Sequence, residues 1–306
     1  MEFKHISVLA DEVIENLNIK PDGIYVDLTL GKGGHSKRIL ENLSENGRLI
    51  ALDQDKDALN AAKENLSDFS NVSYLKSNFE NIDKVLDDLG ISKIDGALMD
   101  IGVSSYQIDN AERGFSYMHD GPLDMRMDTS NELTAEKIVN EYSLDELQKI
   151  FSNYGEERFS RTIARKIVET RDEQRIDTTF KLRDLINKSI RSNEAHPEKR
   201  VFQALRIEVN RELEVLENTL DKIIDHLNVD GRLCVITFHS LEDRIVKNTF
   251  KELEKDCICP PGLPLCVCNH KAKIKIINKK PIIAGKKELK DNSRSKSAKL
   301  RVCQRI

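Results

Sequence analysis

The stretch "DLTLGKGGHS", residues 27–36, is a glycine-rich turn between an apolar run and a helical pattern. In open α/β sheets ligands bind at the carboxyl ends of the strands, and the turn after the first strand is the usual platform. Gly31, Gly33 and Gly34 lack side chains, so the backbone can approach a ligand closely. A plain tight turn explains these glycines about equally well. The stretch therefore predicts an α/β fold and leaves the ligand open.

Apolar runs and helical patterns alternate along the first hundred residues. Between two of these runs "DKDALNAAKENL", residues 55–66, repeats apolar residues near helical spacing. Such short alternation is typical of a parallel, doubly wound sheet. Strands are expected at residues 24–30, 49–52, 72–75 and 94–99.

A helical region interrupts the alternation. Amphipathic, Arg- and Glu-rich patterns replace strand patterns from Ser104 to about Arg200. We then expect one long helix from residue 201, a fifth strand in "GRLCVITFHS" and an antiparallel pair in "KIKII" and "AKLRVCQRI". The prediction is a Rossmann-like α/β domain of residues 1–103 and 206–306 with an all-helical domain, residues 104–205, inserted in it.

Charge is distributed unevenly along the 306 residues. Residues 269–306 contain 13 Lys or Arg and two acids, a net charge of +11, and the other 268 residues carry −15. A basic segment on an acidic body favours a polyanionic partner such as nucleic acid. A solvated, partly disordered tail explains the charge equally well.

No secretion signal and no membrane-spanning run is expected, since acids interrupt the first 17 residues and apolar runs stay short. The protein is therefore predicted to be cytoplasmic, with its six cysteines reduced. No oligomeric state is predicted.

The glycine turn departs from two known fingerprints. A dinucleotide turn needs a third glycine where Ser36 stands, and "GKGGHSK" lacks the Lys-Ser/Thr pair of a P-loop. Asp53 ends the second strand, 22 residues after Gly31, where a carboxylate can accept both ribose hydroxyls of NAD or of S-adenosylmethionine. Asp27 suits a sulfonium and amino group better than a pyrophosphate, or it caps the turn's amides.

Several motifs together resemble one family. "DLTLGKGGHS", "ALDQD", "LMDIGVSSYQID", "RGFSY", "PLDMRMD", "FQALRIEVNRELE" and "TFHSLEDRIVK" resemble the ribosomal small-subunit RNA methyltransferase H family, also called MraW, and the match runs from His5 to the end of the chain. The resemblance implies S-adenosylmethionine-dependent methylation of the exocyclic N4 of cytosine 1402, in the decoding region of 16S rRNA. It also implies a class I methyltransferase domain with an inserted helical domain for substrate recognition. Ser7 replaces the proline expected in the opening segment.

The resemblance also implies site residues. Its cofactor contacts fall on Gly33, Gly34, His35, Asp53, Phe79, Asp100 and Gln107. Asp100 is the expected catalytic residue, accepting a hydrogen bond or the proton from the cytosine amine. Many amino-methyltransferases have an Asp/Asn-Pro-Pro-aromatic motif where this chain has "DIGV", so contact with the cofactor's cationic part is the alternative role of Asp100.

RNA contacts are expected from aromatic and basic residues. The unstacked base requires an aromatic partner, and the candidates are Tyr106, Phe115 and Tyr117, which packing between the domains explains equally well. Phosphate contacts are expected from the basic segment and from Arg113, Arg126, Arg158, Arg161, Arg165 and Arg206. His239 and Ser240 line the acceptor pocket or, more simply, Ser240 caps the next helix.

"CICPPGLPLCVC" places Cys257, Cys259, Cys266 and Cys268 as two C-x-C pairs around a proline-glycine turn. Four thiolates so arranged suit a tetrahedral zinc site, although the usual spacing is C-x-x-C. Reduced thiols in an exposed loop are the alternative.

Two other functions remain open. An NAD-dependent oxidoreductase fits the glycine turn and Asp53 but not Ser36 or the later motifs. A non-catalytic RNA-binding ribosome assembly factor fits the basic segment. The partner expected from the resemblance is 16S rRNA, within the small ribosomal subunit.

Overall fold

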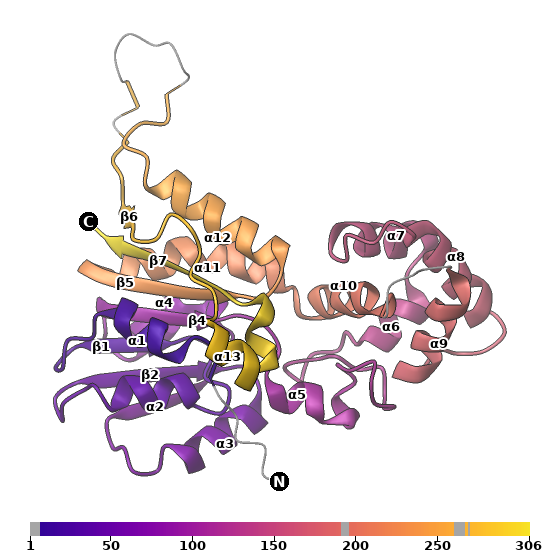
Figure 1. Cartoon of the computed structure of the whole chain (residues 1–306), viewed down its shortest axis with the longest axis horizontal. Helices are drawn as coiled ribbons and strands as arrows, with labels where there is room; N and C mark the ends of the chain where they lie inside the picture. The colour runs from indigo at the N-terminus through magenta and orange to yellow at the C-terminus, as the bar shows by residue number, and fades with distance from the viewer. Residues whose placement is uncertain (1–6, 191–195, 260–266, 269) are drawn as a thin grey trace. The chain divides into compact units, whose positions relative to one another are not determined.

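The computed structural model describes residues 7–190, 196–259, 267–268 and 270–306. The chain divides into two compact units (Figure 1). Unit 1 consists of Met1–Gly102 and Leu213–Ile306, and unit 2 of Val103–Glu212. Among the described residues no helix is long and apolar enough to cross a lipid bilayer.

Unit 1 contains a seven-stranded sheet in the order β3-β2-β1-β4-β5-β7-β6. Strands β1 to β5 are parallel, and β7 runs antiparallel between β5 and β6 (Figure 1). The predicted Rossmann-like sheet and its antiparallel closing pair are thus confirmed. The strands are β1 (Ile24–Asp27), β2 (Arg48–Asp53), β3 (Val72–Lys76), β4 (Ile94–Asp100), β5 (Leu227–Thr237), β6 (Ile274–Ile276) and β7 (Lys299–Arg305).

Successive side chains of each strand point to opposite faces of the sheet, and helices bury both faces. Val26 and Ile50 pack on one face, against helices α4 (Ile82–Asp88), α11 (Glu212–His226) and α12 (Ser240–Leu253). Tyr25 and Leu49 pack on the other face, which is covered by α1 (Ala10–Leu17), α2 (Gly34–Leu40) and α3 (Lys56–Asn65). Burial on both faces explains why the strands are almost continuously apolar.

The basic segment at the end of the chain is largely part of this fold. It contributes β6, α13 (Lys286–Asp291) and β7, and Leu300, Val302 and Cys303 are fully buried. The Glu288 carboxylate accepts a hydrogen bond of 2.8 Å from the Leu9 amide, which ties α13 to the start of the described chain. The described residues of the segment are therefore folded rather than disordered, although many of its lysines are exposed to solvent, as the alternative of a solvated, partly disordered tail expected.

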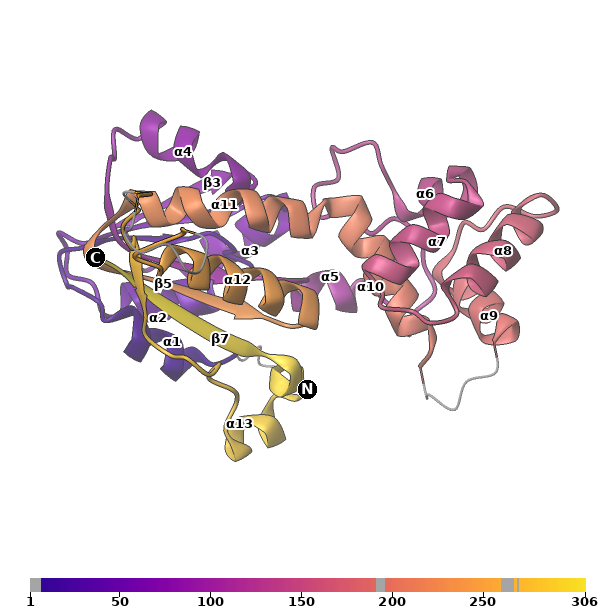
Figure 2. The same ribbon diagram turned by 90° about the horizontal axis from the view of Figure 1, so that it is seen from above.

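Unit 2 is helical, and among its described residues no strand forms beyond an isolated bridge between Pro122 and Thr178. Helices α6 to α10 lie together in Figure 2. Their apolar side chains form one cluster that includes Phe151, Ile163 and Leu205. The amphipathic pattern expected in this region is confirmed in α8, where Ile163 and Ile167 are buried while Arg161 is exposed. The helices are α5 (Ser105–Asp109), α6 (Ala135–Glu141), α7 (Leu144–Asn153), α8 (Ser160–Arg171), α9 (Thr179–Ser189) and α10 (Glu198–Asn210).

The long helix expected from residue 201 is wrong. Helix α10 ends at Asn210, Arg211 adopts the left-handed conformation with φ 51°, and α11 begins at Glu212. The Arg206 guanidinium spans the break and donates two hydrogen bonds to the Glu212 carboxylate, at 2.8 and 2.9 Å. Helical periodicity continues across the break, which is why the sequence pattern conceals it.

Candidate cofactor site at the carboxyl edge of the sheet

The turn between β1 and α2 forms the base of the candidate site. Gly33, with φ 81°, caps α2, and its amide donates to the Leu30 carbonyl at 2.8 Å. Gly31 is also left-handed, with φ 52°, and a Cβ added there would meet no atom within 4 Å. Glycine is favoured at both positions because an L side chain is strained at these φ values. At Gly31 the chain therefore borders open space.

Asp27 and Ser36 explain why the turn departs from the dinucleotide fingerprint. The Ser36 hydroxyl, fully buried, donates to Asp27 Oδ2 at 2.7 Å, and the Thr29 amide donates to Asp27 Oδ1 at 3.1 Å. Burial raises the pKa of Asp27, and these two hydrogen bonds and nearby His35 partly oppose that rise. A glycine in place of Ser36 would leave the buried carboxylate without this donor. Asp27 thus caps the turn, as one of its two predicted roles required.

Asp53 at the end of β2 supports the same turn. Its carboxylate accepts hydrogen bonds from the Gly31 amide at 2.9 Å and the Asp55 amide at 2.8 Å. Burial raises the pKa of Asp53 to about 6, against the opposing effect of these two amides. The side chain therefore changes charge in a pH range where binding can be measured.

Asp100 and His35 meet at the ends of β4 and α2. His35 Nε2 lies 3.5 Å from Asp100 Oδ2, and the Asp100 amide donates to Thr29 Oγ1 at 2.6 Å. Burial alone lowers the pKa of His35, but the Asp100 and Asp27 carboxylates outweigh it, so the pKa is raised. Among the described residues, Asp100 Oδ1 and both His35 ring nitrogens are buried atoms without a hydrogen-bond partner. Buried polar atoms of this kind usually find a ligand or a water.

The other two predicted cofactor residues differ in their surroundings. Phe79 begins a 3₁₀ turn (Phe79–Asn81) after β3 and packs, partly buried, against the core of unit 1. Gln107 belongs to unit 2 and is buried in a capping box at the start of α5, where its side-chain oxygen accepts from the Ser104 amide at 3.0 Å. Gln107 thus has a local structural role that the sequence analysis missed.

The end of β5 corrects the expected helix cap. Helix α12 begins at Ser240 itself, and its N-cap is His239. The buried Glu242 carboxylate accepts from the Phe238 amide at 2.7 Å and the His239 amide at 3.2 Å, so an acid rather than the serine satisfies these donors. Glu242 was missed, although an acid three residues after the N-cap residue is a capping signal.

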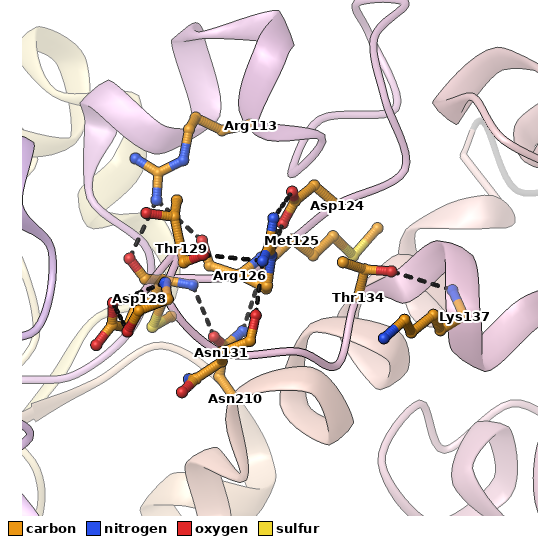
Figure 3. Close-up of polar contacts among 12 residues, drawn as sticks. Arg113, Asp124, Met125, Arg126, Asp128, Thr129, Asn131, Thr134, Lys137 and Asn210 are labelled. Atoms are coloured by element: carbon orange, nitrogen blue, oxygen red, sulfur yellow. Dashed lines mark hydrogen bonds and ion pairs between the residues drawn. The ribbon is translucent and has the colours of Figure 1, made fainter.

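Three motifs of the family resemblance converge in unit 2 (Figure 3). The Asn210 side chain donates to the Met125 carbonyl and accepts from the Met127 amide, both at 2.8 Å. Arg113 donates to the Arg126 and Met127 carbonyls at 2.9 and 3.1 Å. Met125 is left-handed, with φ 64°, so these bonds hold a strained loop.

These bonds and one in the break between α10 and α11 give three of the arginines predicted to contact phosphate a structural role. Arg113 is buried, Arg126 binds the Asp124 carboxylate through two nitrogens, and Arg206 binds Glu212. Arginines occupied in this way stabilise unit 2, and no phosphate contact is proposed for them. The other three candidates, Arg158, Arg161 and Arg165, are exposed.

Asn210→Ala is expected to destabilise the protein by about 2–4 kcal/mol, because it leaves buried backbone groups of a strained loop unsatisfied. Thermal or urea unfolding followed by circular dichroism measures this change. Asn131→Ala is the control, since Asn131 is exposed and its contact to Arg126 uses the backbone carbonyl. Equal stability of the two variants would contradict the structural role of Asn210.

The aromatic candidates also separate. Phe115 is buried in the core of unit 2, and Tyr117 packs on His196 and Phe202 with ring centroids 5.3 and 5.7 Å apart. Both therefore have packing roles. Tyr106, 37% exposed, has the most accessible ring of the three.

Known proteins resemble the chain over its full length. A ribosomal RNA small subunit methyltransferase H from Clostridium botulinum (strain Kyoto) is 60% identical over 309 residues, covering 100% of both chains. A protein of the same name from Lachnospira eligens is 58% identical, covering 100% of this chain and 99% of its own. A solved rRNA methylase from Streptococcus thermophilus superposes on 97% of this chain and 93% of its own with 13% identity and a TM-score of only 0.43, too loosely to identify anything further. A sequence model of the MraW methylase family matches residues 2–306, and the chain therefore belongs to that family.

Proposed function

We propose that this protein transfers a methyl group from S-adenosylmethionine to the exocyclic N4 of cytosine 1402 in 16S rRNA. Membership of a methylase family supports the reaction class, and the names of relatives near 60% identity support small-subunit rRNA as the substrate. The observation that carries the cofactor assignment is the set of buried polar atoms on His35 and Asp100 beside the glycine turn.

The described residues fit S-adenosylmethionine. The open space at Gly31 leaves room for a part of the cofactor that contacts the backbone. Asp53, at the end of β2, is the proposed acceptor of the ribose hydroxyls. A carboxylate at that position disfavours a phosphorylated ribose. Asp100 and Asp27 add negative charge, which suits a cofactor with a cationic sulfur and an amino group. Gly33, Gly34, His35 and Phe79 complete the proposed contacts in unit 1, and Gln107 remains a proposed contact from unit 2.

The methyl donor is activated by its positive sulfur when it is bound. The protein's own task is to align the acceptor for in-line attack and to exclude water. A cytosine amine is a poor nucleophile because its lone pair is delocalised into the ring. Asp100 Oδ1, a buried acceptor, is the proposed partner of that amine. A hydrogen bond from the amine to this oxygen would localise the nitrogen lone pair, and the carboxylate could receive the released proton.

RNA binding is proposed for exposed basic residues of both units. In unit 2 these are Arg158, Arg161 and Arg165, and the helical unit is the proposed substrate-recognition domain. In unit 1 Lys286, Lys287 and Lys290 are exposed on α13. Tyr106 is the proposed partner of the unstacked cytosine.

Replacing Lys286, Lys287 and Lys290 together by glutamine is expected to weaken RNA binding and flatten its salt dependence. The slope of log K against log salt falls by about 0.7–0.9 for each phosphate that a lysine no longer neutralises. Fluorescence anisotropy with a 16S rRNA fragment at several salt concentrations measures the slope. The control replaces Lys56, Lys63 and Lys84, which are exposed outside the basic segment. Identical slopes for the two triple variants would exclude α13 from the interface.

Cofactor affinity is expected to fall below about pH 6. Because the pKa of Asp53 is raised to about 6, its carboxylate is ionised above that pH and accepts ribose hydroxyls best there. One pH unit below the pKa, about a tenth of the sites remain ionised, so affinity falls up to about tenfold. Calorimetry with S-adenosylmethionine at pH 5 to 8 measures this dependence. Asp53→Asn should remove the transition near pH 6, and its persistence in that variant would refute the assignment to Asp53.

The same titration affects stability with a defined sign. The folded-state pKa of Asp53 exceeds the value near 3.9 of an unfolded chain, so its contribution favours folding below about pH 4. That contribution is lost as pH rises through about 6. As pH rises through about 6, ionisation of the Asp53 carboxylate therefore strengthens cofactor binding and lowers the stability of the free protein.

Transfer of labelled methyl groups to 30S subunits tests the proposal against both alternatives. The proposal predicts label in 16S rRNA and calorimetric binding of S-adenosylmethionine. An oxidoreductase would bind NAD instead, and a non-catalytic assembly factor would bind RNA without transferring label. Either result would overturn the proposed function.

A further inference from the structure

Three cysteine sulfurs gather outside the candidate cofactor site. Two stretches of described chain, called legs below, extend from the sheet (Figure 1). The first, residues 254–259, follows α12 and carries Cys257 and Cys259; the second, residues 267–268 and 270–273, precedes β6 and carries Cys268. The Sγ atoms of all three lie within 4.8 Å of one another. The proposed methyltransferase chemistry uses none of them. Cys266, the fourth cysteine of the motif, lies outside the described residues.

The spacing of the sulfurs suits a shared metal ion. Cys257 Sγ and Cys268 Sγ are 3.8 Å apart, whereas a disulfide bond measures about 2.05 Å. Zinc binds thiolates at about 2.3 Å, so two sulfurs at tetrahedral positions around one ion lie about 3.8 Å apart. The observed separation therefore equals that of two ligands of one zinc ion.

Backbone amides point at two of these sulfurs. The Cys259 amide donates to Cys257 Sγ at 3.4 Å, and the Val267 amide donates to Cys259 Sγ at 3.5 Å. Such N–H···S contacts stabilise the thiolate form and orient it, as the groups surrounding a metal site do for its ligands. Both donors belong to the cysteine motif itself, so the hydrogen bonds that orient these two sulfurs form within it.

The legs are joined at their base, which brings the cysteines together. The Lys273 amide donates to the Leu253 carbonyl at 2.8 Å, and the Ile276 amide donates to Glu254 Oε1 at 2.7 Å. The Ala272 amide donates to Asp256 Oδ1 at 3.4 Å. These bonds reduce the entropy lost when the three ligands assemble.

We propose that Cys257, Cys259 and Cys268 bind one Zn²⁺ ion as thiolates. The ion joins the two legs that carry the described cysteines. Each thiol loses its proton on binding, so uptake of zinc releases protons and weakens at low pH. Soft thiolate ligands in this geometry select zinc over magnesium or calcium. The proposal is independent of the methyl-transfer activity.

Metal analysis of the full-length protein, purified with a reductant and without chelator, tests the proposal. We expect one zinc per chain, and loss of that zinc in Cys257→Ser and Cys268→Ser. Cys234→Ala and Cys303→Ala are matched controls, because these cysteines are buried in the sheet core, and both should keep full zinc. Substoichiometric zinc in the wild type, or iron in its place, would overturn the proposal.

Cobalt substitution gives a second measurement that does not depend on the variants folding. The wild-type protein loaded with Co²⁺ should show thiolate-to-cobalt charge-transfer bands and the intense visible bands of tetrahedral coordination. Absence of these bands would contradict a thiolate site. A disulfide between Cys257 and Cys268 in freshly purified protein, detected by mass spectrometry, would also overturn it.

Discussion

Asp100→Ala should lower methyl transfer to 30S subunits by at least about 10²-fold while the protein remains folded. Asp100 ends β4 at the carboxyl edge of the sheet, and its Oδ1 is a buried acceptor without a partner among the described residues. Removing the carboxylate deletes the proposed acceptor for the cytosine amine and the negative charge that lies 3.5 Å from His35 Nε2. Initial rates at saturating S-adenosylmethionine measure the loss.

Two further variants make this result specific. Asp100→Asn keeps the shape of the side chain and removes its charge. If its rate of methyl transfer falls as far as that of Asp100→Ala, the loss of activity is due to the missing charge. Asp88→Ala is the matched control, since Asp88 is an exposed residue at the end of α4 and should retain full activity. Normal turnover by Asp100→Ala would exclude Asp100 from the chemistry.

A chain that ends at Gly285 should not fold. The truncation removes β7, which pairs with both β5 and β6, and with it the buried side chains Leu300 and Val302. Each of these contributes about 1.5–3 kcal/mol by burial, against a total stability of about 5–15 kcal/mol. Far-ultraviolet circular dichroism and thermal unfolding of the truncated chain measure this directly.

Deletion of Ile306 alone is the control for that truncation. Ile306 is 52% exposed and lies beyond β7, so its removal should leave the unfolding transition nearly unchanged. A cooperative transition in the longer truncation would show that β7 is dispensable. Because loss of β7 disrupts the sheet, the RNA role of the basic segment is tested by the lysine variants of α13 instead.

The strands were predictable because their apolar runs are short, regularly spaced and separated by helical patterns. Strands β2, β3 and β4 lie within one residue of the predicted bounds, and the antiparallel pair is confirmed. Two errors have physical reasons. Predicted strand one continues to residue 30, whereas β1 ends at Asp27. Beyond it the Leu28 and Leu30 amides still bond to β4 and β2, but the Thr29 and Gly31 amides bond to the Asp27 and Asp53 carboxylates instead. The break at Arg211 could not be predicted, because the spacing of apolar residues along the sequence continues from α10 into α11.

The candidate site was predictable only in part. Position at the sheet edge was enough to name Asp53, which ends the second strand, whereas the family resemblance supplies Asp100. The bond between Ser36 and Asp27, by contrast, joins residues nine positions apart and depends on the tertiary turn. Likewise, the roles of Arg113 and Arg126 depend on carbonyls and acids of a strained loop, and charge alone does not distinguish them from surface arginines. The cofactor contacts themselves stay predictions.

Identification of the methylated nucleoside tests the central claim most directly. 30S subunits that lack the modification are incubated with this protein and methyl-labelled S-adenosylmethionine, and the 16S rRNA is digested and analysed by mass spectrometry. We predict one labelled nucleoside, N4-methylated cytidine, in the fragment that contains cytosine 1402, and no label with Asp100→Ala. Label on another nucleoside, or no label at all with folded wild-type protein, would contradict the account.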